Sequence, residues 1–173
     1  MGNVALDNRV HASESVAGIS TGEKNSAANS SVVMVKTSRF GEVEVDLDRV
    51  ITLTSPLLGF PESRRFFLRA HGPDSPFMWL QSLDNPNLAF VVVQPLVVNP
   101  EYRPAVNMQV RTELEIKDDT EMDLMLILTI PAGRAKEMTA NLLGPVVFNV
   151  RKRLARQMLL DPTRYDSTWR VLS

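Results

Sequence analysis

The sequence predicts a mainly β fold, a small antiparallel β-barrel-like domain with one or two short helices. Short apolar stretches alternate with polar residues at a period of two, as half-buried strands do. Turn signals built from glycine, proline, asparagine and aspartate separate these stretches, and only two short segments fit a helical period. Many short strands with few helices favour a closed or nearly closed barrel, because closure leaves few open strand edges.

The first 31 residues differ in composition from the rest of the chain. From His11 to Ser31 the residues are mostly small and polar, rich in Ser, Asn and Ala, with no aromatic residue and no apolar period. Such a segment buries too little surface to offset the entropy lost on ordering. We expect a disordered tail over 1–31, with an arm that orders in a complex as the alternative, and one folded domain over 32–173.

The strands of the predicted domain follow one another closely. A β-rich run over 32–37 is followed by Glu42–Asp48, where acids occupy one face and aliphatic residues the other. This alternation is typical of a half-buried antiparallel strand. Tight turns, such as Asp84-Asn85-Pro86, indicate hairpins between neighbouring strands. Further strands are expected at 50–53, 64–69, 77–83, 89–93, 124–130, 145–150 and 155–160.

Two segments favour helix over strand. Between residues 100 and 115, Val106, Val110 and Leu114 fit one helical face, although strict alternation also fits this stretch. Asn107 is a suitable N-cap, so we predict a short helix over Met108–Leu114. A single helical turn is expected at 135–138.

The composition excludes several classes of site. The chain has no cysteine, two histidines and a formal net charge of -1, so thiolate metal sites, multi-histidine metal sites and histidine-based triads have almost no material. No glycine-rich phosphate loop is present, and the balanced charge disfavours a nucleic-acid binder. The longest apolar runs are far shorter than the roughly 20 residues of a membrane-spanning helix. We expect a cytoplasmic protein with no cofactor, no metal and no membrane contact.

The acidic row Glu42, Glu44, Asp46 and Asp48 is either a solvated face or a surface for a basic partner. Alternate residues of a strand lie about 6–7 Å apart, which suits neither a single metal ion nor a tuned pair of catalytic carboxylates. A basic cluster at 151–156 is expected at a hairpin tip, and 118–123 at an exposed turn.

A strand-turn-strand segment over 74–92 carries a tryptophan, Trp79, that could line a pocket. Alternation places Phe77, Trp79 and Gln81 on one face. Tryptophan offers a large area and one hydrogen-bond donor, so Trp79 is either a binding residue or a core residue. The sequence leaves both interpretations open.

This segment resembles the flagellar assembly factor FliW family. The family motif of Ser-Pro-Phe-x-Trp-Leu-Gln-Ser, then an Asp-x-Pro turn, matches 75–82 and 84–86. Its other motifs, in the same order, match Gly59-Phe60-Pro61, Pro100-Glu101-Tyr102, Thr129-Ile130-Pro131 and Met138-Thr139-Ala140-Asn141-Leu142. The resemblance spans about 32–165.

The resemblance implies a cytosolic, non-enzymatic binding protein with a small β-barrel-like fold. Proteins of this family bind the RNA-binding translational regulator CsrA and relieve its repression of flagellin translation. They also bind flagellin, and the two partners exchange. We further expect a protein that is monomeric when free and does not bind nucleic acid directly.

The acidic strand and the matched motifs together give a set of expected partner-binding residues. The acidic face would attract the basic surface of CsrA, and an apolar groove near Phe60, Trp79 and Met138 would take a flagellin helix. Two rival functions are a split-barrel flavin-binding enzyme and a nucleic-acid-binding β-barrel module. The expected residues are Glu42, Glu44, Asp46, Phe60, Trp79, Gln81, Asp84, Met138, Thr139 and Asn141.

Overall fold

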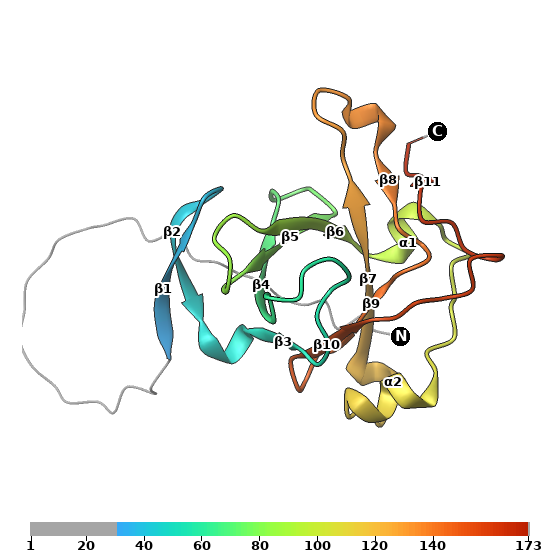
Figure 1. Ribbon diagram of the computed structural model, residues 1–173, viewed down its shortest axis with the longest axis horizontal. Helices are drawn as coiled ribbons and strands as arrows, with labels where there is room; N and C mark the ends of the chain where they lie inside the picture. Colours follow the sequence, from blue (N-terminus) through green and yellow to red (C-terminus); the bar gives the residue numbers. More distant parts are fainter. Residues whose placement is uncertain (1–30, 173) are drawn as a thin grey trace, which may run out of the picture.

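A computed structural model describes residues 31–172 of the chain (Figure 1). The predicted tail over 1–31 therefore lies outside the described residues except for Ser31, whose carbonyl accepts a hydrogen bond from Leu47 N (2.9 Å). The strands are β1 (Val32–Thr37), β2 (Gly41–Asp46), β3 (Ile51–Leu53), β4 (Arg65–Ala70), β5 (Phe77–Ser82), β6 (Ala89–Val93), β7 (Met122–Thr129), β8 (Thr139–Ala140), β9 (Val146–Asn149), β10 (Leu154–Gln157) and β11 (Trp169–Arg170). The helices are α1 (Pro95–Val98) and α2 (Met108–Glu113), with single 3-10 turns at Leu47–Arg49, Asp119–Glu121 and Ala135–Glu137.

Seven of these strands close into a barrel, as the sequence predicts. Their order is β7-β6-β5-β4-β3-β10-β9, and β9 pairs again with the first half of β7. The second half of β7 pairs with β6 on one edge and with the short β8 on the other. The strand β11 pairs antiparallel with the other edge of β8. The strand β7 therefore belongs both to the closed ring and to a small side sheet (Figure 1).

One pair of strands departs from the expected antiparallel arrangement. The strands β3 and β10 run parallel, with Thr52 opposite Leu154 and Leu53 opposite Ala155. Strand directions cannot alternate all the way around a ring of seven, so at least one neighbouring pair must be parallel. The β3–β10 pair meets this requirement at the point where the barrel closes.

The barrel interior is filled by one apolar core. A barrel of this size is just wide enough for its side chains to fill. Phe66 on β4, Leu80 on β5 and Val92 on β6 are buried to 1% exposure or less. Met125 of β7 and Phe148 of β9 belong to the same interior cluster, together with further buried residues of β3, β4, β9 and β10.

Three further clusters cover the outside of the barrel, so several strands are buried on both faces. Tyr102, Met138 and Leu142 cover the outer face of β6 and β7. Val110 of α2 and Leu114, the residue that caps its C-terminus, pack over β7 and β9. The β1–β2 hairpin covers β4, and these outer layers explain why the residues over 80–82 are all buried.

Most of the predicted strands and helices are present in the structure, and the differences are at the ends of elements and in three short elements. The helix α2 begins after Asn107, whose side chain accepts a hydrogen bond from Val110 N (2.9 Å), so the predicted cap is confirmed. The predicted turn at 135–138 is a 3-10 turn, and the predicted strand over 155–160 ends at Gln157. The helix α1 and the short strands β8 and β11 were not predicted from the sequence. Within 31–172, no helix has the length and apolarity to cross a bilayer.

A buried asparagine ties α2 to the β9–β10 turn. Asn149 is 1% exposed. Its Nδ2 donates to the carbonyls of Leu114 (2.8 Å) and Glu115 (3.2 Å), and its Oδ1 accepts from the amides of Arg151 and Lys152 (3.0 Å each). One side chain therefore satisfies four backbone groups of two segments.

We predict that Asn149→Ala lowers the free energy of unfolding by about 2–3 kcal/mol, because it leaves buried backbone groups without partners. Chemical denaturation monitored by circular dichroism measures this loss. The matched control is Asn85→Ala, since Asn85 accepts one local hydrogen bond on an exposed turn. An equal effect of the two substitutions would contradict the role given to Asn149.

A carboxylate without a cation lies at one end of the barrel interior. Asp123 shares a strand face with Met125 and stands opposite Phe148, both in the interior core. It accepts hydrogen bonds from Leu124 N (2.8 Å) and Gln94 Nε2 (3.4 Å), and within 31–172 no ion pair includes it. Burial raises the pKa of Asp123, and these two hydrogen bonds only partly offset the rise.

We predict that Asp123→Asn stabilises the fold at pH 7. A raised folded-state pKa means that the native protein loses stability as the pH rises from the unfolded pKa of about 3.9 through the folded pKa. The asparagine variant lacks this penalty, so the gain is present at neutral pH and disappears below about pH 4. Denaturation of both proteins at several pH values measures the gain, and a gain that persists unchanged at low pH would refute the cause.

Candidate partner-binding surface

The β1–β2 hairpin lies outside the barrel as a second layer (Figure 1). Val43 and Val45 on its inner face are 6% and 4% exposed and pack with Phe67, which points outward from β4. Val35 and Phe40 complete this contact from the β1 side and from the turn. The hairpin is therefore held to the barrel through one apolar face.

The opposite face of the hairpin carries the predicted acidic row, in a shorter form. Glu42 and Glu44 are exposed and alternate with the buried Val43 and Val45, so the predicted alternation is confirmed. Lys36 lies across from Glu42 on β1, with its Nζ 3.9 Å from Glu42 Oε1. Two exposed carboxylates thus remain on this face of the strand.

The other two acids of the row have different roles. Asp46 ends β2 and its Oδ1 accepts a hydrogen bond from Asp48 N (2.9 Å), which caps the following 3-10 turn. Its Oδ2 lies 3.9 Å from Nε of Arg49. Asp48 belongs to that turn rather than to the strand, so the predicted extension of the strand to residue 48 is wrong.

The turn of the hairpin is fixed from both sides. Thr37 is 7% exposed, and its hydroxyl accepts from Phe40 N (2.9 Å) and donates to the carbonyl of Gly41 (3.0 Å). Gly41 has φ +68°, a conformation that favours glycine. Ser38 N donates to the carbonyl of Pro86 (2.9 Å), which attaches the turn to the β5–β6 loop.

Trp79 lies beneath this turn. It points outward from β5, directly opposite Arg69 on β4. The Arg39 guanidinium carbon lies 4.3 Å from the Trp79 ring centroid, and the Phe40 ring meets the same indole edge-on at 5.7 Å. His71 stacks against it at 6.0 Å. The tryptophan is half-buried by residues of its own chain and lies outside the interior core.

Gln81 and Asp84 serve the β5–β6 turn in this conformation. Gln81 is fully buried, and its Nε2 donates to the carbonyls of Ser82 and Leu88 (3.0 Å each). Asp84 Oδ2 accepts from the amides of Arg64 and Arg65 (2.8 Å each), and its Oδ1 accepts from the Arg65 guanidinium. The Asp84 carboxylate is occupied within the chain. The Nε2 group of Gln81 is occupied as well, whereas its buried Oε1 has no hydrogen-bond partner among the described residues.

Electrostatics agree with a structural role for Asp84. Burial alone would raise its pKa, but the hydrogen bonds from Arg64 N and Arg65 N and the Arg65 guanidinium outweigh burial and hold the pKa below its ordinary value. The carboxylate is thus kept ionised as an anchor of the turn.

The remaining predicted residues lie in other parts of the fold. Phe60 is 38% exposed, and its ring meets Phe90 edge-on at 5.0 Å. Met138 is buried in the cluster over β6 and β7, so it does not reach the surface. Thr139 lies in β8, and Asn141 Oδ1 accepts from Gly144 N (2.9 Å). Phe60, Trp79 and Met138 have separate surroundings, so the single apolar groove expected around them is not formed.

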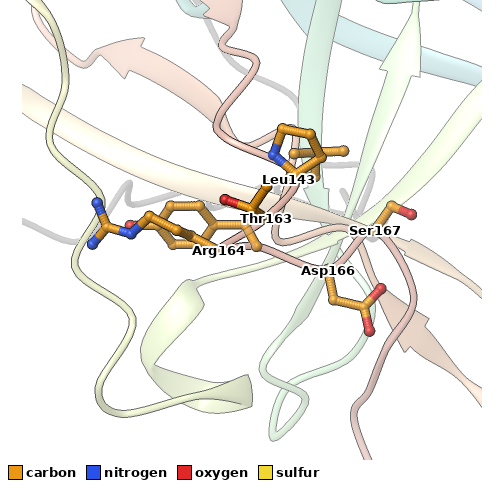
Figure 2. A pocket seen from close by; sticks show the side chains of 7 residues that line it. Leu143, Thr163, Arg164, Asp166 and Ser167 are labelled. Carbon is orange, nitrogen blue, oxygen red and sulfur yellow. The ribbon is translucent and has the colours of Figure 1, made fainter.

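A surface hollow of about 320 Å³ lies at Leu143, which follows Asn141 closely in the chain, and Figure 2 shows its lining. Leu143 and the loop from Pro162 to Ser167 form it. The side chains of Arg164 and Asp166 extend to opposite sides, and Asp166 Oδ1 accepts hydrogen bonds from Thr168. No polar groups of this loop converge on a common point in the hollow.

The predicted basic cluster lies at the β9–β10 turn and the start of β10, and three of its four cations pair with acids. Arg151 pairs with Glu121 (3.5 Å) and Lys152 with Glu115 (3.1 Å). Arg156 pairs with Glu113 of α2. Among residues 31–172, no group of three or more histidine, aspartate and glutamate side chains could hold a metal ion.

None of the residues that surround Trp79 was predicted as a site residue, and the two arginines among them differ in how they could have been found. Arg39 stacks on Trp79, and the Arg69 guanidinium carbon lies 4.6 Å from the centroid of the Phe40 ring. Arg69 could have been found from the alternation of β4 once β4 was paired with β5. Arg39 could not, because its contact depends on how the hairpin folds over the barrel.

Comparison with known proteins agrees with this architecture. The chain is 40% identical over 125 residues to a protein of Magnetococcus marinus named flagellar assembly factor FliW, covering 72% of this chain and 77% of that one. It is 38% identical over 133 residues to the protein of the same name from Geobacter sulfurreducens, covering 77% and 82%.

A solved structure and a family model complete the comparison. The crystal structure of a flagellar assembly factor FliW superimposes with a TM-score of 0.75 at 30% identity, covering 82% of this chain and 98% of that chain. The model of the FliW protein family matches residues 34–171, which include the hairpin, the barrel and the outer layers. The chain therefore belongs to the FliW family of flagellar assembly factors.

Proposed function

We propose that this chain binds the translational regulator CsrA in the cytoplasm and thereby relieves repression of flagellin translation. It also binds flagellin, and the two partners exchange. It acts as a monomer when free, through binding rather than catalysis. Membership of the FliW family supports this function, and the exposed Glu42 and Glu44 face of β2 is the observation that carries it.

The physical basis of CsrA binding is complementary charge. Glu42 and Glu44 point away from the barrel on a strand whose other face is fixed by Val43 and Val45. Their positions are thus set by the fold, while their charges remain exposed to a partner. A basic RNA-binding surface would be attracted to this face, and complementary charges raise the association rate and fix the orientation of a complex.

We predict that Glu42→Lys combined with Glu44→Lys weakens CsrA binding by about tenfold or more, since like charges then face each other. Titration calorimetry at two or more salt concentrations measures this, and the variant should show a weaker dependence on salt. Glu101→Lys is the matched control, because Glu101 is exposed outside the hairpin. Unchanged affinity in the double variant would mean that CsrA binds elsewhere.

The loop between β3 and β4 supports a site for flagellin. Leu58 is 67% exposed and Phe60 38% exposed on this loop, which is fixed by a hydrogen bond from Leu58 N to Gln157 Oε1 (3.2 Å). Exposed apolar residues on a fixed loop suit the apolar face of an amphipathic helix, which the ends of flagellin provide.

We predict that Leu58→Ser with Phe60→Ser reduces flagellin capture several-fold and leaves CsrA capture unchanged, because only apolar contact area is lost. Pull-downs with each partner alone, then with both in competition, measure this. Leu172→Ser is the control for loss of an exposed apolar residue elsewhere. Equal losses for both partners would indicate a single shared surface. A yellow purified protein would instead favour the flavin-binding alternative.

A further inference from the structure

The turn of the hairpin and the ends of β4 and β5 form an alternating set of cationic and aromatic side chains. We call this set the arginine–aromatic cluster: Arg39, Phe40, Arg69, His71 and Trp79. Its successive contacts are 4.3 Å from Arg39 to Trp79, 5.7 Å from Trp79 to Phe40 and 4.6 Å from Phe40 to Arg69. Both guanidinium groups therefore lie over aromatic rings that touch each other.

Neither of these guanidinium groups has an anionic partner in the part of the chain that the structure describes. Arg65, Arg111 and Arg156 each pair with a carboxylate, whereas no ion pair includes Arg39 or Arg69. Arg39 is exposed and Arg69 half-buried. Two positive charges are thus fixed near each other with their hydrogen-bond donors still available.

The aromatic rings make this arrangement more than a local excess of charge. Stacking on Trp79 and Phe40 restricts the arginine side chains, so less rotamer entropy is lost when a ligand binds. Arg69 and Trp79 are directly opposite each other on paired strands, which fixes their spacing. Planar guanidinium groups held in this way match the geometry of carboxylates, which they bind through two parallel hydrogen bonds.

We propose that the arginine–aromatic cluster is a docking site for an acidic peptide segment of a protein partner, whose carboxylates pair with Arg39 and Arg69. This site is distinct from the Glu42 and Glu44 face and does not depend on the function proposed above. The partner segment carries at least two aspartate or glutamate residues, and its backbone lies against the exposed edges of His71 and Trp79.

A protein segment fits this site better than a nucleic acid. The same hairpin that supplies Arg39 also carries Glu42 and Glu44 on its outer face, and these would repel a long polyanion. The chain as a whole has a formal net charge of -1, without the basic excess of nucleic-acid binders. A short acidic segment can reach the two arginines without passing along the acidic face.

Fluorescence of Trp79 tests the proposal directly. Trp169→Phe removes the other tryptophan of the chain, so the remaining emission reports on the cluster. A blocked glutamate-rich peptide should change this emission in a saturable way, and added salt should weaken its binding. The glutamine counterpart of the peptide should not bind. Equal binding of the two peptides would overturn the proposal. Tighter binding of an oligouridylate than of the glutamate-rich peptide would also overturn it and would indicate an RNA site instead.

Variants of the two arginines complete the test. Arg39→Gln and Arg69→Gln should each weaken binding of the glutamate-rich peptide by about tenfold or more, because a charge-assisted hydrogen bond is lost. Arg164→Gln is the matched control, because Arg164 also stacks on an aromatic ring, Tyr165, at 5.7 Å. Thermal unfolding checks that each variant is folded. If Arg39→Gln destabilises the hairpin, the result for Arg69→Gln alone decides the test. The same loss in all three variants, or in none, would refute the site.

Discussion

Closure of the barrel through the parallel pairing of β3 and β10 is the constraint on which the rest of the structure depends. Without it, the interior side chains of β3, including Ile51 and Leu53, would lie at an open edge instead of at 2% exposure. The pairing also fixes β10, and thereby the turn after β9 that Asn149 holds against α2. A ring of seven strands needs at least one parallel pair, and β3–β10 is the pair that supplies it here.

A second consequence of closure is that the barrel needs an outer layer. Phe67 and Trp79 point away from the interior and would otherwise be exposed to water, and the β1–β2 hairpin covers them. The hairpin thus stabilises the barrel with one face and presents Glu42 and Glu44 with the other. An exposed acidic face arises from the same strand that completes the apolar packing, because side chains alternate along it.

Local patterns predicted most of the elements, and contacts distant in sequence account for the failures. The Asn107 cap with Val110 and Leu114 was sufficient to predict α2. The parallel β3–β10 pair could not be predicted, because nothing in Ile51–Leu53 indicates a partner about a hundred residues later. At the candidate surface, the exposure of Glu42 and Glu44 followed from alternation. The cover over Trp79 did not, because Arg39 reaches it only when the hairpin has packed on the barrel.

The parallel pair also orders events during synthesis. On the ribosome, β3 is made long before Leu154 and Ala155 of β10. The edge of β3 that pairs with β10 therefore has no partner while β4 to β9 are made. Pairings between such distant segments form slowly, since a long loop must first close. The ring of strands therefore cannot close until β10 has been synthesised.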